Sequence, residues 1–267
     1  MDRKVTLAVH KFSSCDGCQL ALLNMGATLV ELAERVEIKH FAEAGVLDEE
    51  AQVDVALVEG SVVTAADEQR IQRVRNNSKY LITMGACATS GGIQALKNLA
   101  EDPESWTAQI YPQPEFIDSL ERSSAIKAYV EVDFELWGCP INSQQITAVV
   151  TQLLSGVVPW DDREKLCIEC KRQGHVCTLI TQNAPCMGPV TRNGCGALCP
   201  AFGRACYGCY GDASLPNYSG LAVRFNGLGL LPKQVEQRFT LIHHDPEARL
   251  PIGNSDNQRH REGQADE

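Results

Sequence analysis

The sequence has no long apolar run and no excess of positive charge. No stretch of its 267 residues approaches the roughly 18 consecutive apolar residues that a membrane-spanning helix needs. Lys and Arg number 24 against 34 Asp and Glu, so the formal net charge is -10. A chain this acidic is poorly suited to sequence-independent nucleic-acid binding, which depends on neutralising phosphates. We therefore expect neither a membrane nor a nucleic acid among its partners.

The first residues also lack the features of an export signal. The charged segment Met1–Lys4 leads into Val5–Val9, an apolar run shorter than the about 7–15 residues of a signal core. No twin-arginine pair stands nearby, and the run predicts a strand instead. We therefore expect a cytoplasmic protein, in which thiols stay reduced and cysteines more often bind metals or react than form disulfides.

Cysteine, by contrast, is abundant and unevenly distributed. The 12 cysteines make up about 4.5% of the chain, well below the density of a small disulfide scaffold. Four lie within residues 1–166 and eight within residues 167–209, a region rich in Gly and Pro and poor in periodicity. The contrast predicts two domains, over residues 1–160 and 161–252. A polar tail over 253–267 is predicted to be disordered.

Strand-like and helical patterns alternate through the first region. The predicted strands are Val5–Val9, Val36–Phe41, Val53–Val58, Tyr80–Met84 and Val130–Trp137. Four helices are predicted. Two of them are Gln19–Ala33 and Ile93–Leu99. Another opens with the capping box Thr64–Asp67 and runs through Arg75, and the last is capped by Asn142 and stopped by Gly156. This alternation predicts an α/β fold with an open parallel sheet, in which ligands bind beyond the carboxyl ends of the strands.

Each of the four early cysteines follows a predicted strand. Cys15 and Cys18 come after the first strand, Cys87 after Met84, and Cys139 after Trp137. The fold would therefore gather four thiolates at one edge of the sheet, as in a metal site. A single free cysteine such as Cys87 is more often a small buried hydrophobic residue. The convergence of all four, with a Cys-x2-Cys pair among them, favours the metal site.

The eight late cysteines form two groups of four. The groups are Cys167-x2-Cys170-x6-Cys177-x8-Cys186 and Cys195-x3-Cys199-x6-Cys206-x2-Cys209. Zinc and iron–sulfur clusters both accept four cysteines, so the spacing leaves both open. Three such sets in one chain favour a series of redox centres over three structural zinc sites. The division into sets stays open where the two groups adjoin, at Cys186 and Cys195.

Four separated motifs resemble those of the small subunits of nickel–iron hydrogenases. They are Ser13-Ser14-Cys15-Asp16-Gly17-Cys18-Gln19, Gly85-Ala86-Cys87-Ala88, Trp137-Gly138-Cys139-Pro140 and Pro185-Cys186-Met187-Gly188-Pro189-Val190-Thr191. They occur in the family order, and the resemblance extends from about residue 4 to residue 240. The chain is most similar to the cytoplasmic, NADP-linked class, also called sulfhydrogenase. In that class the small subunit is the delta chain of a four-subunit complex.

The resemblance implies a flavodoxin-like domain followed by a mostly irregular domain, with three iron–sulfur clusters between them. It assigns a proximal [4Fe–4S] cluster to Cys15, Cys18, Cys87 and Cys139, a distal one to Cys167, Cys170, Cys177 and Cys186, and a medial one to Cys195, Cys199, Cys206 and Cys209. Exported relatives have a histidine where this chain has Cys167 and a proline where it has Cys199. Both differences predict three four-iron clusters.

The resemblance also places Glu59 near the proximal cluster and the interface with the large subunit. A solvated carboxylate at the end of a strand is the competing interpretation of Glu59. No catalytic residue is expected in this chain. It would carry electrons between the nickel–iron centre of a large subunit and a flavin subunit that uses NADP(H), with a ferredoxin-like iron–sulfur subunit in the same complex. The direction of hydrogen turnover, and whether sulfur is also reduced, stay open.

The sequence leaves three alternatives open. The first is a small subunit of a hydrogenase with another acceptor, such as a deazaflavin or a heterodisulfide reductase. The second is a zinc-binding structural protein. The third is the related cluster-bearing subunit of respiratory NADH dehydrogenase. That subunit has adjacent cysteines in place of the Cys15-x2-Cys18 pair and lacks the eight-cysteine region, so the sequence disfavours it.

Overall fold

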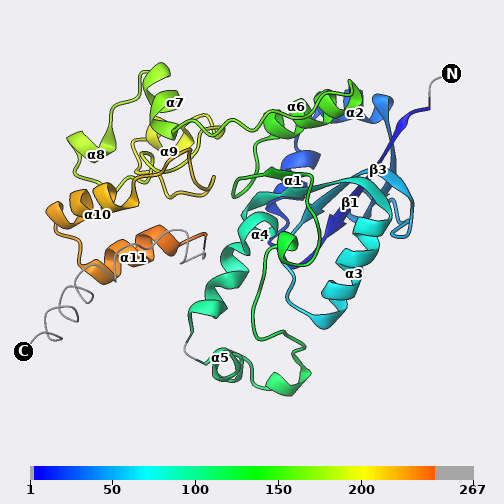
Figure 1. Ribbon diagram of the computed structural model, residues 1–267, viewed down its shortest axis with the longest axis horizontal. Coiled ribbons are helices and arrows are strands. Elements are labelled where there is room, and N and C mark those ends of the chain that lie inside the picture. The colour runs from blue at the N-terminus through cyan, green and yellow to red at the C-terminus, as the bar shows by residue number, and fades with distance from the viewer. Residues whose placement is uncertain (1–2, 101, 244–267) are drawn as a thin grey trace, which may run out of the picture. The chain divides into compact units, whose positions relative to one another are not determined.

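The computed structural model describes residues 3–100 and 102–243. The chain divides into two compact units (Figure 1). The first holds the chain up to Asp161 together with Cys209–Gly211, and the second holds Asp162–Gly208 and the described residues from Asp212 onward. The polar tail predicted at 253–267 lies outside the described residues. Within the described ranges, no helix is long and apolar enough to cross a membrane.

A five-stranded parallel sheet forms the centre of the first unit. Its strands are β1 (Val5–Lys11), β2 (Val36–Phe41), β3 (Val53–Glu59), β4 (Ser78–Met84) and β5 (Phe134–Leu136). They lie in the order β2-β1-β3-β4-β5, and each neighbouring pair is parallel. This is the flavodoxin-like order of doubly wound α/β proteins, whose strand order reverses between β1 and β3. The predicted fold class is therefore confirmed.

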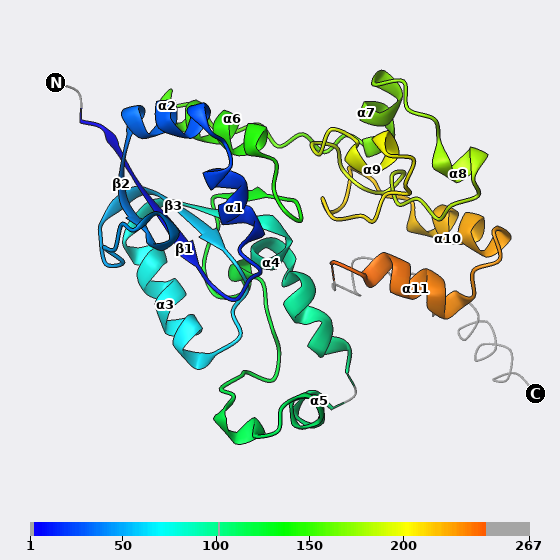
Figure 2. The same ribbon diagram turned by 180° about the vertical axis from the view of Figure 1, so that it is seen from behind.

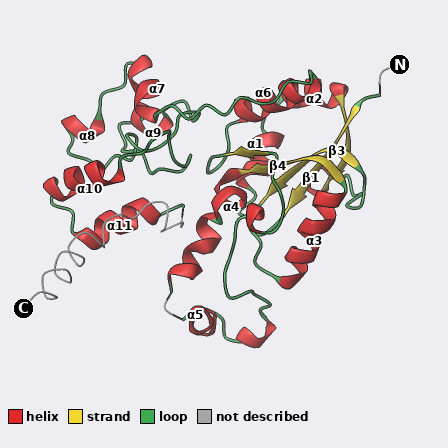
Figure 3. Ribbon diagram, in the orientation of Figure 1, coloured by secondary structure: helices red, strands yellow, loops and turns green. Residues whose placement is uncertain are grey.

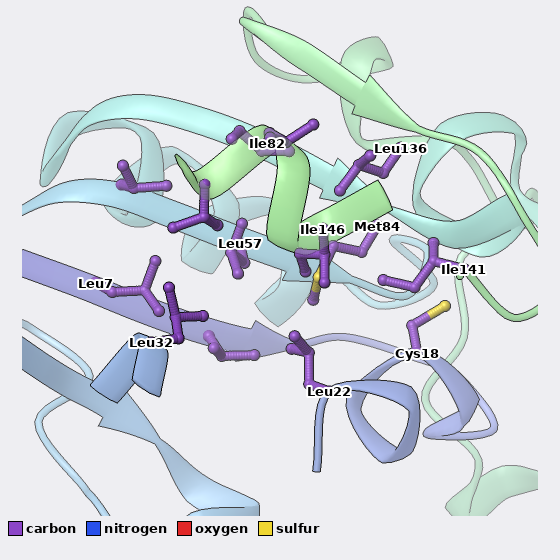
Figure 4. Packing of buried hydrophobic residues seen from close by; sticks show 14 of the residues in the cluster. Leu7, Cys18, Leu22, Leu32, Leu57, Ile82, Met84, Leu136, Ile141 and Ile146 are labelled. Atoms are coloured by element: carbon purple, nitrogen blue, oxygen red, sulfur yellow. The ribbon is translucent and has the colours of Figure 1, made fainter. Parts of the chain in front are cut away.

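Helices cover both faces of this sheet (Figure 2). The helices of the first unit are α1 (Gly17–Leu23), α2 (Ala27–Arg35), α3 (Ala65–Asn76), α4 (Gly85–Ser90), α5 (Pro103–Ile110) and α6 (Ser143–Leu154), with the 3₁₀ segments η1 (Ala42–Ala44), η2 (Gly92–Leu99), η3 (Pro114–Phe116) and η4 (Ile126–Ala128). Of these, α5 lies away from the sheet (Figure 2). Leu22, Leu32 and Ile146 bring α1, α2 and α6 onto one face (Figure 4). Ile71 and Val74 of α3 pack on the other. Burial on both faces explains the nearly continuous apolar strands.

Side-chain caps fix the starts of two of these helices. Thr64 and Asp67 form the capping box predicted for α3, and Asn142 opens α6 as predicted, with Gln145 completing a second box. The segment predicted as a helix over Ile93–Leu99 is the 3₁₀ segment η2.

Two sequence-based boundaries are wrong. The helix predicted over Gln19–Ala33 is two helices, because the chain turns at Gly26 with a φ of 60°, a conformation that glycine adopts without steric cost. The strand predicted over Val130–Trp137 shortens to the three residues of β5. Its ladder with β4 begins late because the Asp133 carboxylate, rather than the backbone, accepts the Leu81 N–H at 2.7 Å.

The second unit is less regular than the first (Figure 3). Its helices are α7 (Leu166–Arg172), α8 (Thr178–Thr181), α9 (Leu198–Ala201), α10 (Tyr218–Gly227) and α11 (Pro232–Thr240). Phe225 and Phe239 of the last two helices form its small apolar core with Leu166 and Met187. Loops carry most of the chain between α7 and α10, which is the cysteine-rich region of the sequence.

Candidate metal centres

The five parallel strands end at one rim of the sheet, and the early cysteines lie there, after three of the strands. Cys15 and Cys18 follow β1, Cys87 lies in α4 directly after β4, and Cys139 follows β5. Each of the four thiols is close enough to at least two of the others to interact electrostatically. The topology thus brings together all four residues predicted to form the proximal set.

Burial makes three of these rim thiols, Cys18, Cys87 and Cys139, poor acids by raising their pKa values. Burial, together with the smaller effects of the charges of Cys139 and Cys15, raises the pKa of Cys87 to about 12. Burial likewise raises the pKa of Cys18 far above its ordinary value, with Glu59 as the next contributor. Four thiolates therefore coexist here only with a positively charged group among them. A metal supplies that charge, because coordination deprotonates a thiol outright.

The backbone around these sulfurs is shaped to receive them. A Cβ added at Gly85 would lie less than 3.0 Å from the Cys18 sulfur, and one at Gly92 would lie 2.8 Å from the Cys87 sulfur. The backbone N–H of Ile141 donates a hydrogen bond to Cys18, and that of Ile93 donates to Cys87. Such donors stabilise thiolate ligands. The residues present therefore fit a four-thiolate cluster site at this rim.

Glu59 ends β3 at the same rim. It is 2% exposed, so it is not a solvated strand-end carboxylate. Its two oxygens accept the backbone N–H groups of Cys18 and Gln19 at 3.0 and 3.1 Å, at the start of α1. Burial raises the pKa of this carboxyl, while these hydrogen bonds oppose the shift. Glu59 thus holds the segment that carries the Cys-x2-Cys pair.

The first four late cysteines are also gathered in the second unit. Cys167 and Cys170 lie in α7, and Cys177 directly precedes α8. Burial raises the pKa of Cys167 to about 11, followed by the charges of Cys186, Cys177 and Cys170. A Cβ added at Gly188 would lie 3.4 Å from the Cys167 sulfur and 3.5 Å from that of Cys186. The four residues predicted to form the distal set thus surround one site.

The last four cysteines are divided differently. Cys195, Cys199 and Cys206 lie in the second unit, whereas Cys209 belongs to the short segment grouped with the first. Backbone N–H groups donate to each of the three sulfurs in the second unit, from Leu198 to Cys195, from Tyr207 to Cys199 and, at 3.3 Å, from Gly208 to Cys206. Three residues of the predicted medial set therefore have donors suited to thiolate ligands.

Cys186 stands between the two late groups. Its sulfur accepts the backbone N–H of Cys206 at 3.2 Å, and its charge acts on Cys199 as well as on Cys167. Cys186 is thus in contact with residues of both groups.

A single metal ion does not fit these sets as they stand. No group of three or more His, Cys, Asp or Glu side chains in the described ranges is arranged to hold one ion. Zinc at about 2.3 Å from each sulfur would bring the four sulfurs within about 4 Å of one another. An iron–sulfur cluster is a larger group that four cysteines also hold. The zinc alternative therefore gains no support from the geometry.

Two charged residues near these sites are not predictable from the sequence. Glu169 accepts three backbone N–H groups around Cys195. Arg238 of α11 donates to the carbonyl oxygens of Pro185 and Cys206, both at 3.1 Å. Glu169 lies inside the Cys167-x2-Cys170 pair, but that spacing gives the intervening residues no role, and Arg238 belongs to no recognisable motif. The only available signal was indirect, since Gly194 and Gly196 flank Cys195 and suggest a loop of unusual conformation.

Comparison with known proteins shows the family to which this chain belongs. Residues 15–153 match the family described as "NADH ubiquinone oxidoreductase, 20 Kd subunit". The chain is 34% identical over 215 residues to sulfhydrogenase 2 subunit delta of Pyrococcus furiosus, a match that covers 80% of this chain and 90% of that protein. This chain therefore belongs to that family of oxidoreductase subunits, and within it the chain is a small subunit of a nickel–iron hydrogenase.

Two further relatives extend the comparison. A subunit of the F420-non-reducing hydrogenase vhu of Methanococcus voltae is 30% identical over 275 residues, which cover 91% of this chain and 95% of that protein. A crystal structure of an NAD+-reducing [NiFe]-hydrogenase in the H2-reduced state contains a chain that is 28% identical. That match has a TM-score of 0.55 and covers 60% of this chain and 96% of the other. The chain is thus a non-catalytic subunit of an oxidoreductase.

Proposed function

We propose that this chain carries electrons between the nickel–iron centre of a large subunit and a flavin subunit that reacts with NADP(H), in a cytoplasmic hydrogenase. One observation carries the proposal most directly. The ends of β1, β4 and β5 bring four cysteines, distant in sequence, to one rim of the sheet. Membership in the hydrogenase small-subunit family supports the same role.

The proposal assigns each cysteine to one of three [4Fe–4S] clusters. Cys15, Cys18, Cys87 and Cys139 would hold the proximal cluster, Cys167, Cys170, Cys177 and Cys186 the distal one, and Cys195, Cys199, Cys206 and Cys209 the medial one. When bound, these clusters supply one-electron redox chemistry. The chain itself supplies thiolates, a partly buried setting and hydrogen-bond donors to sulfur.

The backbone donors have a definite effect in this scheme. N–H groups of Ile141 and Ile93 stabilise negative charge on Cys18 and Cys87. Hydrogen bonds to ligand sulfur and the degree of burial both tune cluster potentials. Glu59 is proposed to lie beside the proximal cluster and to fix the loop that holds the first two ligands, since it accepts the Cys18 N–H at 3.0 Å.

The choice of NADP(H) as the final acceptor rests on the resemblance of the sequence motifs to the NADP-linked class, and two relatives support a related role. One is named a sulfhydrogenase, and another belongs to an NAD+-reducing enzyme. A second candidate follows from the F420-non-reducing relative, which matches 91% of this chain. In that case the same small subunit would serve a complex with another acceptor, such as a heterodisulfide reductase. The partners proposed here are the large subunit, the flavin subunit and a ferredoxin-like iron–sulfur subunit.

Anaerobic co-purification tests the proposal. The chain is purified with its partners, and iron, acid-labile sulfide and nickel are assayed together with hydrogen-dependent reduction of NADP+. We expect about twelve irons on this chain, from three four-iron clusters, and a partner that contains nickel. Hydrogen-dependent reduction of a dye but not of NADP+ would favour the second candidate.

A ligand variant sharpens the iron count. Cys18→Ser should reduce the iron from about twelve to about eight per chain, because one four-iron cluster loses a ligand. Ser155→Ala is a control beyond the end of α6, where the exposed side chain donates its hydroxyl to the Thr151 carbonyl oxygen at 2.9 Å, and it should keep the full iron content. Zinc in place of iron, or the absence of a nickel-bearing partner, would refute the proposed function.

A further inference from the structure

Glu169 lies in α7, between Cys167 and Cys170, but its carboxylate binds a different segment. Oε1 accepts the backbone N–H of Gly196 at 3.1 Å, and Oε2 accepts those of Gly194 and Ala197, both at 3.2 Å. Three N–H groups from four consecutive residues make an anion-binding nest. The anion in this nest is a side chain of the protein itself.

The loop that forms the nest has an unusual backbone. Gly194, Gly196 and Ala197 have φ values of 115°, 68° and 48°. Ala197 is fully buried and is not a glycine, so its left-handed conformation carries a steric cost. The carboxylate of Glu169 offsets that cost because only this conformation directs the N–H groups to one point.

The same loop carries a proposed medial ligand. The sulfur of Cys195 accepts hydrogen bonds from the backbone N–H groups of Leu198 and Ala197. The Ala197 N–H is therefore shared between the Cys195 sulfur and Oε2 of Glu169. On the other side, the charge of Glu169 acts on Cys170, a proposed distal ligand. One carboxylate thus borders ligands of two clusters.

We propose that Glu169 is a positioning residue that ties the loop of Cys195 to the helix of Cys167 and Cys170, and that its charge lowers the reduction potentials of the medial and distal clusters. The inference rests on the proposed function. A fixed negative charge close to a cluster opposes the addition of an electron. The carboxylate also accepts a hydrogen bond from the Ala197 N–H, which would otherwise donate to the Cys195 sulfur alone.

The test uses the anaerobically purified holo-complex and two isosteric variants. Glu169→Gln removes the charge and keeps the size of the side chain. Glu164→Gln is the matched control, because its carboxylate is about half exposed and pairs with Arg172 at 3.2 Å. Reduction of each cluster is followed by electron paramagnetic resonance during a redox titration, with iron content measured on the same samples.

We expect Glu169→Gln to raise both potentials. At the ambient potential where half of a wild-type cluster is reduced, the ratio of reduced to oxidised cluster should rise at least threefold, or about 28 mV at 59 mV per tenfold change. The reduction potential of the proximal cluster should stay unchanged in both Glu169→Gln and Glu164→Gln. Medial and distal potentials that match those of Glu164→Gln, at full iron content, would overturn the inference. Wild-type protein without iron would instead refute the proposed function.

A second variant separates charge from position. Glu169→Asp keeps the charge but shortens the side chain, so it should leave both potentials closer to wild type than Glu169→Gln does. Amide hydrogen exchange at Gly194, Gly196 and Ala197 should be faster in this variant, because the shorter carboxylate reaches the nest less well. The inference would be overturned if Glu169→Asp and Glu169→Gln shifted the potentials equally. It would also be overturned if amide exchange at all three residues were unchanged in Glu169→Asp.

Discussion

Replacing Gly85 by alanine should displace the sulfur of Cys18 at the rim of the sheet. Gly85 opens α4 with a φ of 84°, and an added Cβ would meet the Cys18 sulfur at less than 3.0 Å, a separation that Cβ atoms do not adopt. The same Cβ would lie 3.4 Å from the Gly138 carbonyl oxygen. The methyl group therefore has no free direction, and the thiol of Cys18 must move.

The expected cost has two parts. A left-handed conformation costs an L-residue about 1–2 kcal/mol. Forcing a methyl group into a packed site costs a further ~1–3 kcal/mol. The free energy of unfolding should thus fall by roughly 2–5 kcal/mol in Gly85→Ala.

Gly45→Ala isolates the first part. Gly45 has a φ of 80°, nearly that of Gly85, but an added Cβ there meets nothing within 4 Å. This control should lose only about 1–2 kcal/mol. Urea unfolding of the two variants and the wild-type chain, all without metal, measures the difference. The difference between the variants is the cost of the contact with Cys18.

Iron binding provides the second measurement. After anaerobic reconstitution, Gly85→Ala should retain about eight of about twelve irons, because one cluster loses its place at Cys18. Gly45→Ala should retain all of them. Equal stability and equal iron in the two variants would show that the close approach of Gly85 to the Cys18 sulfur is unimportant, and the reasoning would be refuted.

Two further predictions concern the folding of the first unit. Burial, with the nearby charges of His40 and Arg70, lowers the pKa of His10 to about 3. Below the unfolded value of about 6.5 the unfolded chain binds a proton that the folded chain does not, so the free energy of unfolding falls progressively as the pH drops from about 6.5 towards 3. The loss should reach about 2 kcal/mol at pH 5; urea unfolding measures it, and an equal loss in His10→Gln would contradict the assignment. Thr64→Ala should cost about 1 kcal/mol by removing the oxygen that accepts the Asp67 N–H at 3.1 Å. Thr64→Ser should retain most of this stability, and equal unfolding midpoints for the two variants would argue against the cap.

The sheet and its rim could be predicted because they depend on short-range patterns and one general rule. Val53–Val58 and Tyr80–Met84 have the pattern of buried strands, and both lie within observed strands. Parallel strands place their carboxyl ends together, so cysteines after separate strands must converge. The helix starts at Thr64 and Asn142 followed from side chains that cap their own backbone.

Other features depend on contacts that no local pattern encodes. Gly26 splits a helix whose apolar spacing continues across the break. Glu59 could equally have been a solvated residue until the packing of α1 against β3 buried it. Glu169 sits in a helix, and nothing in the spacing of α7 indicates that its carboxylate reaches residues 194–197. Each of these outcomes is decided by a partner distant in sequence.

Charged side chains bind backbone groups beside three of the cysteines. Loops cannot pair their backbone groups in a ladder, so buried N–H and C=O groups need other partners. Glu59 and Glu169 accept N–H groups beside Cys18 and Cys195, and Arg238 donates to the carbonyl oxygen of Cys206. These side chains carry charge. The groups that hold the segments around the cysteines therefore also contribute to the electrostatic potential at the sulfur atoms. Loop geometry and the electrostatics of the proposed clusters are therefore coupled, and a change at any of these three residues should alter both.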